Sequence, residues 1–187
     1  MHQLLAIPDP CAPPVHPSVT ASFAGPHLRC SLKGPARLVR LIQAAGYGME
    51  GDLLRPSLSA GSFWFENSLF RSLLRQADTE LRSQGNVTLE HRSVVAKLVL
   101  RDLLAIRKDW TENFDSFVTL QIPAGKCVSA VIGTVAPQPV YSPGNPGHAT
   151  AQSAGIRLNG SVPQVVIDFS RPSNREAKGW IQGPFLL

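Results

Sequence analysis

Side chains that could carry acid–base or metal chemistry are scattered along the 187-residue chain. Cys11, Cys30 and Cys127 lie far apart without a Cys-x-x-Cys pair, so their spacing excludes a zinc framework, and the odd number excludes a scaffold of paired disulfides. A Cys11–Cys30 bridge in an exported chain and three free thiols in a reducing compartment both stay open, and the second is simpler. Asp109, Glu112 and Asp115 lack the glycine and ligand register of a calcium loop, so no metal site is predicted.

The residues of a hydrolase triad can be picked out of the second half of the chain. Ser142, His148 and Asp168 supply the three side-chain types, but no Gly-x-Ser-x-Gly turn surrounds the serine. His91, between Glu90 and Arg92, is typical of a solvated helix face. The histidines therefore do not define a catalytic centre.

An arginine, an aromatic cluster and a glutamine offer a different chemistry. Arg55 ends a short apolar segment, and arginine is favoured where phosphate is bound, although an arginine at a strand end is more often simply exposed to solvent. The aromatic run Phe63-Trp64-Phe65 suits either a pocket or the core. Gln164, between a proline and a β-prone run, is either a hydrogen-bonding site residue or an edge residue.

Alternating apolar and polar residues predict the strands that would position these groups. Residues 118–122 alternate between apolar and polar, 127–133 follow a Pro-Ala-Gly-Lys turn, and 165–169 form a third β-prone segment. Residues 137–155 hold four prolines and three glycines, which predicts a long irregular loop between strands and a place for a binding site. Residues 171–187 are expected to be an irregular tail.

The first half of the chain is predicted to be mainly helical. Apolar residues at helical spacing predict helices over 67–84 and 88–108, and a short helix is expected from Pro35 to Gly46. Residues 1–35 hold seven of the sixteen prolines and are expected to be an extended arm or linker. The prediction is therefore an α+β fold: a Pro-rich arm (1–35), then one domain (36–187) whose helical N-terminal half packs on a mixed or antiparallel sheet from the C-terminal half.

The net charge and the distribution of apolar residues restrict the classes of partner that the protein can be expected to have. The net charge of +5 permits nucleic acid, a membrane surface or a phosphate-bearing small molecule, but no run of five like charges occurs, so nucleic acid is not favoured. No stretch of 18 apolar residues is present and the first residues lack the pattern of a signal peptide, so neither a membrane span nor a signal peptide is expected.

Several short motifs together resemble ADP-ribosyltransferase-like domains of bacterial polymorphic toxins, over about residues 50–170. They are Asp52-Leu-Leu-Arg55 with Ser57, Gly61-Ser-Phe-Trp64, Val118-Thr-Leu-Gln-Ile-Pro-Ala-Gly-Lys126, Gly133-Thr-Val-Ala-Pro-Gln138 and Leu158-Asn-Gly-Ser-Val-Pro-Gln164. The chain departs from the family where Gly160-Ser-Val-Pro163 replaces a run of glycines, and where Gln164 stands in place of the glutamate of arginine-modifying enzymes.

The resemblance implies an ADP-ribosyltransferase-like fold and an NAD-consuming enzyme, either an ADP-ribosyltransferase or an NAD glycohydrolase, that acts as a toxin or effector. Arg55 and Gln164 would be catalytic, and NAD, as substrate, would contact Arg55, Ser57, Phe63 and Trp64. A target protein or an immunity protein would be the partner, and a secretion system would deliver the domain to a target-cell cytoplasm. The alternative is a non-enzymatic protein-interaction module that uses loop 137–155 and the N-terminal arm. A nucleic-acid-associated basic module is the third option.

Overall fold

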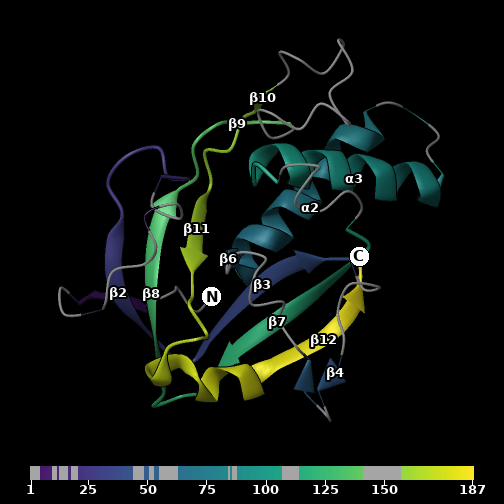
Figure 1. Cartoon of the computed structure of the whole chain (residues 1–187). Coiled ribbons are helices and arrows are strands. Elements are labelled where there is room, and N and C mark those ends of the chain that lie inside the picture. The colour runs from purple at the N-terminus through teal and green to yellow at the C-terminus, as the bar shows by residue number, and fades with distance from the viewer. Residues whose placement is uncertain are drawn as a thin grey trace.

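The protein is built around one eight-stranded antiparallel sheet, seen in a computed structural model (Figure 1). The structure describes residues 5–9, 12, 17, 21–43, 49–50, 53–54, 63–83, 85, 88–106, 114–140 and 157–187. The strand order is β1-β2-β8-β11-β6-β3-β7-β12. The bounds of these strands are β1 Leu5–Pro8, β2 Leu28–Lys33, β8 Cys127–Thr134, β11 Pro163–Val166, β6 Phe63–Glu66, β3 Ala36–Ile42, β7 Ser116–Ile122 and β12 Ile181–Leu186.

Among the described residues, the remaining elements are two α-helices, two short 3₁₀ helices and two small two-stranded sheets. Helix α2 (Asn67–Arg82) and helix α3 (Leu89–Leu103) pack against each other between β6 and β7 in the chain, and Figure 1 shows them together at one end of the bent sheet. Strands β9 (Gln138–Pro139) and β10 (Arg157–Leu158) form one small antiparallel sheet, and β4 (Met49–Glu50) and β5 (Leu53–Leu54) form the other. The 3₁₀ helices η2 (Pro172–Asn174) and η3 (Glu176–Trp180) precede β12.

Apolar residues on both faces of the sheet create two layers of core. One face packs under the C-terminal segment in a cluster that includes Trp64, Leu38, Leu120 and Val165. The other face packs against the helices and the β9–β10 region, in two clusters represented by Val39, Phe65, Phe70, Leu73 and Leu100, and by Phe23, Val131, Leu158 and Val166. Successive residues of a strand point to opposite faces, so each central strand serves both layers.

The predicted helical N-terminal half is wrong, because six strands, β1 to β6, come before α2 in the chain. Residues predicted as a helix from Pro35 to Gly46 form β3 instead. Its residues from Leu38 to Ile42 are all buried, so no alternation marks the strand, and Leu38, Leu41 and Ile42 fit a helical period by coincidence. The class is a largely β fold with two α-helices among the described residues.

Two further expectations at the ends of the chain are wrong. Within the expected Pro-rich arm, Leu5–Pro8 and Leu28–Lys33 are strands of the main sheet. The prolines of the arm lie outside these two strands in the sequence, except for Pro8, which ends the edge strand β1. A proline is tolerated there because an edge strand does not need every backbone N–H for pairing. Within the expected irregular tail, Ile181–Leu186 pairs with β7 as the other edge strand. The predictions of α2, α3, β7 and β8 are confirmed to within a few residues. None of the described helices has the length and apolar character needed to cross a membrane.

Candidate functional site

A cavity of about 780 Å³ opens where β3 and the β6–α2 segment separate. β3 pairs with β6 only at Leu38–Glu66 and Val39–Phe65, because the chain turns into α2 at Asn67. The start of β3 therefore has β7 on one side and the first turns of α2 on the other. The lining residues come from these three elements and the turns next to them: Pro35, Ala36, Arg37, Glu66, Asn67, Ser68, Arg71, Ser72, Arg75, Gln121, Ile122 and Pro123.

The helix that borders the cavity is held by its apolar stripe. Phe70, Leu73, Ala77 and Leu81 are buried at spacings of three and four residues, which turns the intervening polar residues outward. Glu66 is the N-cap residue, and its side chain makes no capping hydrogen bond. The first-turn N–H groups of α2, which have no partner within the helix, are thus left without a side-chain cap at the cavity.

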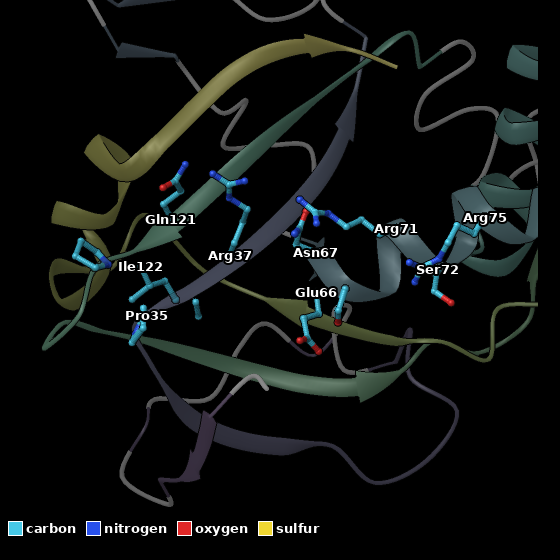
Figure 2. Close-up of a pocket in the computed structure, with 12 residues that line it drawn as sticks. Pro35, Arg37, Glu66, Asn67, Arg71, Ser72, Arg75, Gln121 and Ile122 are labelled. Atoms are coloured by element: carbon cyan, nitrogen blue, oxygen red, sulfur yellow. The ribbon is translucent and has the colours of Figure 1, made fainter. Parts of the chain in front are cut away.

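Three arginines give the cavity a positive charge. Arg37 comes from β3, and Arg71 and Arg75 lie four residues apart on α2. All three are exposed, and none forms an ion pair with another described residue. Figure 2 shows Arg37 and Gln121 rising from neighbouring strands, with Arg71 extending from α2 toward them. Such a group of unpaired guanidinium groups beside a helix N-terminus favours an anionic ligand.

Glu66 is the one carboxylate among these lining residues. It stands at the end of β6, and in Figure 2 its side chain points away from the three guanidinium groups. Because its side chain neither caps α2 nor pairs with a lining arginine, the carboxylate remains available to a ligand. The cavity therefore combines a cationic region with one separate negative charge.

The structure does not bring the site residues predicted from the sequence into this cavity. Arg55 and Ser57 lie outside the described residues, just after β5. Trp64 is fully buried in the core, with its ring centroid 5.9 Å from that of Phe169, and its indole nitrogen has no hydrogen-bond partner among the described residues. Phe63 is half-buried and makes an edge contact with Phe23 at 6.3 Å.

Gln164 is on the opposite face of the sheet from Trp64. Trp64 pairs with Val165 across β6 and β11, so the preceding residue, Gln164, points to the other side. Gln164 is 4% exposed, and its Nε2 donates a 2.7 Å hydrogen bond to the carbonyl oxygen of Leu104. The strands that carry Arg37, Trp64 and Gln164 are nevertheless direct neighbours, in the order β3, β6, β11.

The other reactive side chains have structural surroundings. Partial burial acts to raise the pKa of Asp168, but hydrogen bonds from Ser170 and Arg171 outweigh it and hold that pKa below its ordinary value. Ser142 and His148, the other candidate triad members, lie outside the described residues. Burial and the nearby charge of Asp9 raise the pKa of Cys30 to about 11, so this free thiol is a poor nucleophile. No group of three His, Cys, Asp or Glu side chains that could hold a metal ion occurs among the described residues.

Sequence reasoning missed the four charged lining residues: Arg37, Arg71, Arg75 and Glu66. Arg71 and Arg75 were visible as cations one turn apart near the start of a helix, which is a weak signal for an anion site. Arg37 gave no signal, because its segment fits a helical pattern. Comparison of the chain with protein-family models, curated proteins and solved structures found no match.

Proposed function

We propose that the cavity between β3, β7 and α2 binds a phosphate-bearing nucleotide, and that the protein consumes NAD there as an ADP-ribosyltransferase or NAD glycohydrolase. The observation that carries the proposal is the convergence of Arg37, from a strand, and Arg71, from a helix, on one cavity of about 780 Å³. Cavities of roughly 300–1,000 Å³ are typical of small-molecule and cofactor sites.

The phosphates of the ligand are held by the cationic side of the cavity. Arg37 and Arg71 reach in from a strand and from a helix, so together they can contact both phosphates of a pyrophosphate through paired N–H donors. The uncapped N–H groups at the start of α2 add donors and a positive helix dipole.

The reaction is cleavage of the bond between nicotinamide and ribose. The electron pair of that bond leaves with nicotinamide, and the ribose carbon acquires the positive charge of an oxocarbenium-like centre. The carboxylate of Glu66 is the lining group that can stabilise this charge. Water or an acceptor side chain then forms the new C–O or C–N bond and loses a proton.

The sequence resemblance predicts the same activity, but through other residues. Trp64 and Gln164 lie on opposite faces of neighbouring strands and neither lines the cavity, so the proposal depends on the lining arginines. In this proposal Arg37 takes the ligand-binding role that the sequence gave to Arg55. A role as toxin or effector, with a target protein and an immunity protein as partners, belongs to the same proposal.

The test is binding and turnover of NAD by the full chain. Isothermal titration would measure NAD affinity, and chromatography would measure released nicotinamide. We expect Arg37→Ala and Arg71→Ala each to weaken NAD binding about tenfold, since a charge-assisted hydrogen bond contributes about 1.5 kcal/mol or more. Arg82→Ala is the matched control, because Arg82 lies on the same helix, is exposed and does not line the cavity. Absence of NAD binding by the folded wild-type protein would overturn the proposal.

A non-enzymatic protein-interaction module is the second candidate. Most of the loop expected to make contact lies outside the described residues, but the apolar side chains of Val94 and Leu98 are 50% and 58% exposed one turn apart on α3. Exposed apolar groups of this kind are typical of docking surfaces when they form a continuous patch. A folded protein that neither binds nor consumes NAD would favour this second function.

A further inference from the structure

Arg75 extends the cationic side of the cavity beyond what a pyrophosphate requires. It follows Arg71 by one helical turn on α2, so their Cα atoms are separated by about 6 Å along the helix axis. Arg37 and Arg71 face each other across the cavity, whereas Figure 2 shows Arg75 farther along α2, beside Ser72. The two phosphates of a pyrophosphate share a bridging oxygen, so Arg37 and Arg71 can serve both, and Arg75 is left without an anion.

The charge on the cationic side of the cavity points the same way. Three arginines and one glutamate are the ionisable residues among those that line the cavity, and Glu66 points away from the arginines (Figure 2). In the proposed function Glu66 balances the positive nicotinamide–ribose end of the ligand, which leaves all three arginines for phosphate groups. A pyrophosphate diester carries two negative charges, which Arg37 and Arg71 neutralise. Ser72 adds a hydroxyl donor next to Arg75, and a guanidinium group with a neighbouring hydroxyl is a common pair of donors for a phosphate monoester.

We propose that Arg75 and Ser72 bind a third phosphate, and that the preferred substrate is therefore NADP, the dinucleotide that bears a phosphate on the 2′-oxygen of its adenosine ribose. This inference rests on the proposed function. A 2′-phosphate carries a charge of about −1.5 to −2 at neutral pH, and arginine is the residue that accommodates it in other dinucleotide sites.

The experiment compares NAD with NADP on the full chain by isothermal titration. We expect NADP to bind about tenfold more tightly than NAD, which is the effect of one added charge-assisted contact at an exposed site. Arg75→Ala should remove this preference by weakening NADP about tenfold while changing NAD less than about twofold. Ser72→Ala should give a smaller loss for NADP alone, and Arg82→Ala, on the last turn of α2, should change neither ligand.

The possible results separate the two proposals. Equal affinity for NAD and NADP, unchanged by Arg75→Ala, would overturn the third-phosphate site and leave NAD binding intact. ATP tests the source of the third phosphate, since equal Arg75-dependent binding of ATP and NADP would show that the site recognises phosphate number and would overturn the assignment to the 2′-position. Failure of the wild-type protein to bind NAD, NADP and ATP would overturn both proposals.

Discussion

The side-chain amide of Gln164 on β11 donates a 2.7 Å hydrogen bond to the backbone carbonyl oxygen of Leu104, the C-cap residue of α3. Carbonyl groups in the last turn of a helix have no partner within the helix, so a buried donor there stabilises the helix end. Asp102, in the last turn of α3, also links the helix to the segment before β11, because its carboxylate accepts a 2.9 Å hydrogen bond from the backbone N–H of Asn159. The end of α3 is thus fixed to the turn that leads into β11.

This relationship predicts a stability role for Gln164. Gln164→Ala should lower the free energy of unfolding by about 1–3 kcal/mol, because it leaves the buried carbonyl of Leu104 without its donor and removes packed atoms. Gln164→Glu should be destabilising at neutral pH, since a carboxylate cannot donate. Urea unfolding followed by circular dichroism measures both changes.

Nicotinamide release by the same variants tests the catalytic role predicted for Gln164 from the sequence. A variant with wild-type stability but no turnover would support catalysis and contradict the stability role. Loss of stability with normal turnover in the remaining folded protein would leave Gln164 as a residue that positions β11. Gln138→Ala offers a matched control, because Gln138 is half-buried and its amide donates to the carbonyl of Ala136 rather than to α3.

Elements with a regular pattern of burial were predictable from the sequence. The stripe of Phe70, Leu73, Ala77 and Leu81 marks α2, and the turn at Gly125, with φ of +77°, separates β7 from β8 as the Pro-Ala-Gly-Lys motif predicts. β3 was not predictable, because burial on both faces erases the alternation on which a strand prediction depends. The edge strands were hidden for another reason: β1 and β12 owe their conformation to pairing, and β12 pairs with residues about 65 positions earlier.

The candidate site was less predictable than the fold. The charged residues that line the cavity come from two segments of the chain, because Arg37 precedes Glu66, Arg71 and Arg75 by more than 25 positions. Arg37 on β3 lies next to the start of α2 only because β6, the neighbour of β3, ends there. Conversely, the sequence left Trp64 as a candidate for both ligand stacking and the core, and the structure places it in the core, where β6 pairs with β11. Local sequence cannot decide which face of a central strand meets a cavity.

Gly34 lies in the turn before β3, and replacing it should disturb the edge of the cavity. A Cβ atom at this position would overlap the backbone carbonyl oxygen of Pro123, and the backbone N–H of Gly34 donates to the carbonyl of Lys126 at 2.9 Å. Because backbone atoms have little room to move, we expect Gly34→Ala to lower the free energy of unfolding by about 3 kcal/mol or more. Gly179→Ala is the control, since nothing lies within 4 Å of the Cβ it would add. Equal melting temperatures for the two variants would contradict the expected overlap between a Cβ atom at position 34 and the carbonyl oxygen of Pro123.

Asp168 should give the protein part of its stability at neutral pH. Its pKa is lower in the folded chain than in the unfolded chain, because hydrogen bonds from Ser170 and Arg171 outweigh partial burial. The folded state therefore binds the proton less readily, and the contribution is present above the unfolded pKa of about 3.9 and is lost as the pH falls through the folded value. The stability difference between wild type and Asp168→Asn should be constant above about pH 5 and should narrow below about pH 4. Chemical denaturation across this range measures it, and a difference that widens toward acid pH would contradict the assignment.

Thr119 on β7 offers a stabilising substitution. It is 4% exposed, it faces Val39 on one neighbouring strand and Gln182 on the other, and its hydroxyl has no hydrogen-bond partner among the described residues. A buried hydroxyl without a partner costs about 1–3 kcal/mol, and valine keeps the branched shape that fits a strand. Thr119→Val should therefore raise the free energy of unfolding by about 1 kcal/mol, whereas Thr134→Val, at an exposed position of β8, should change it little. A loss of stability in Thr119→Val would show instead that the hydroxyl is hydrogen-bonded in solution, which places a polar partner between β7 and the helices.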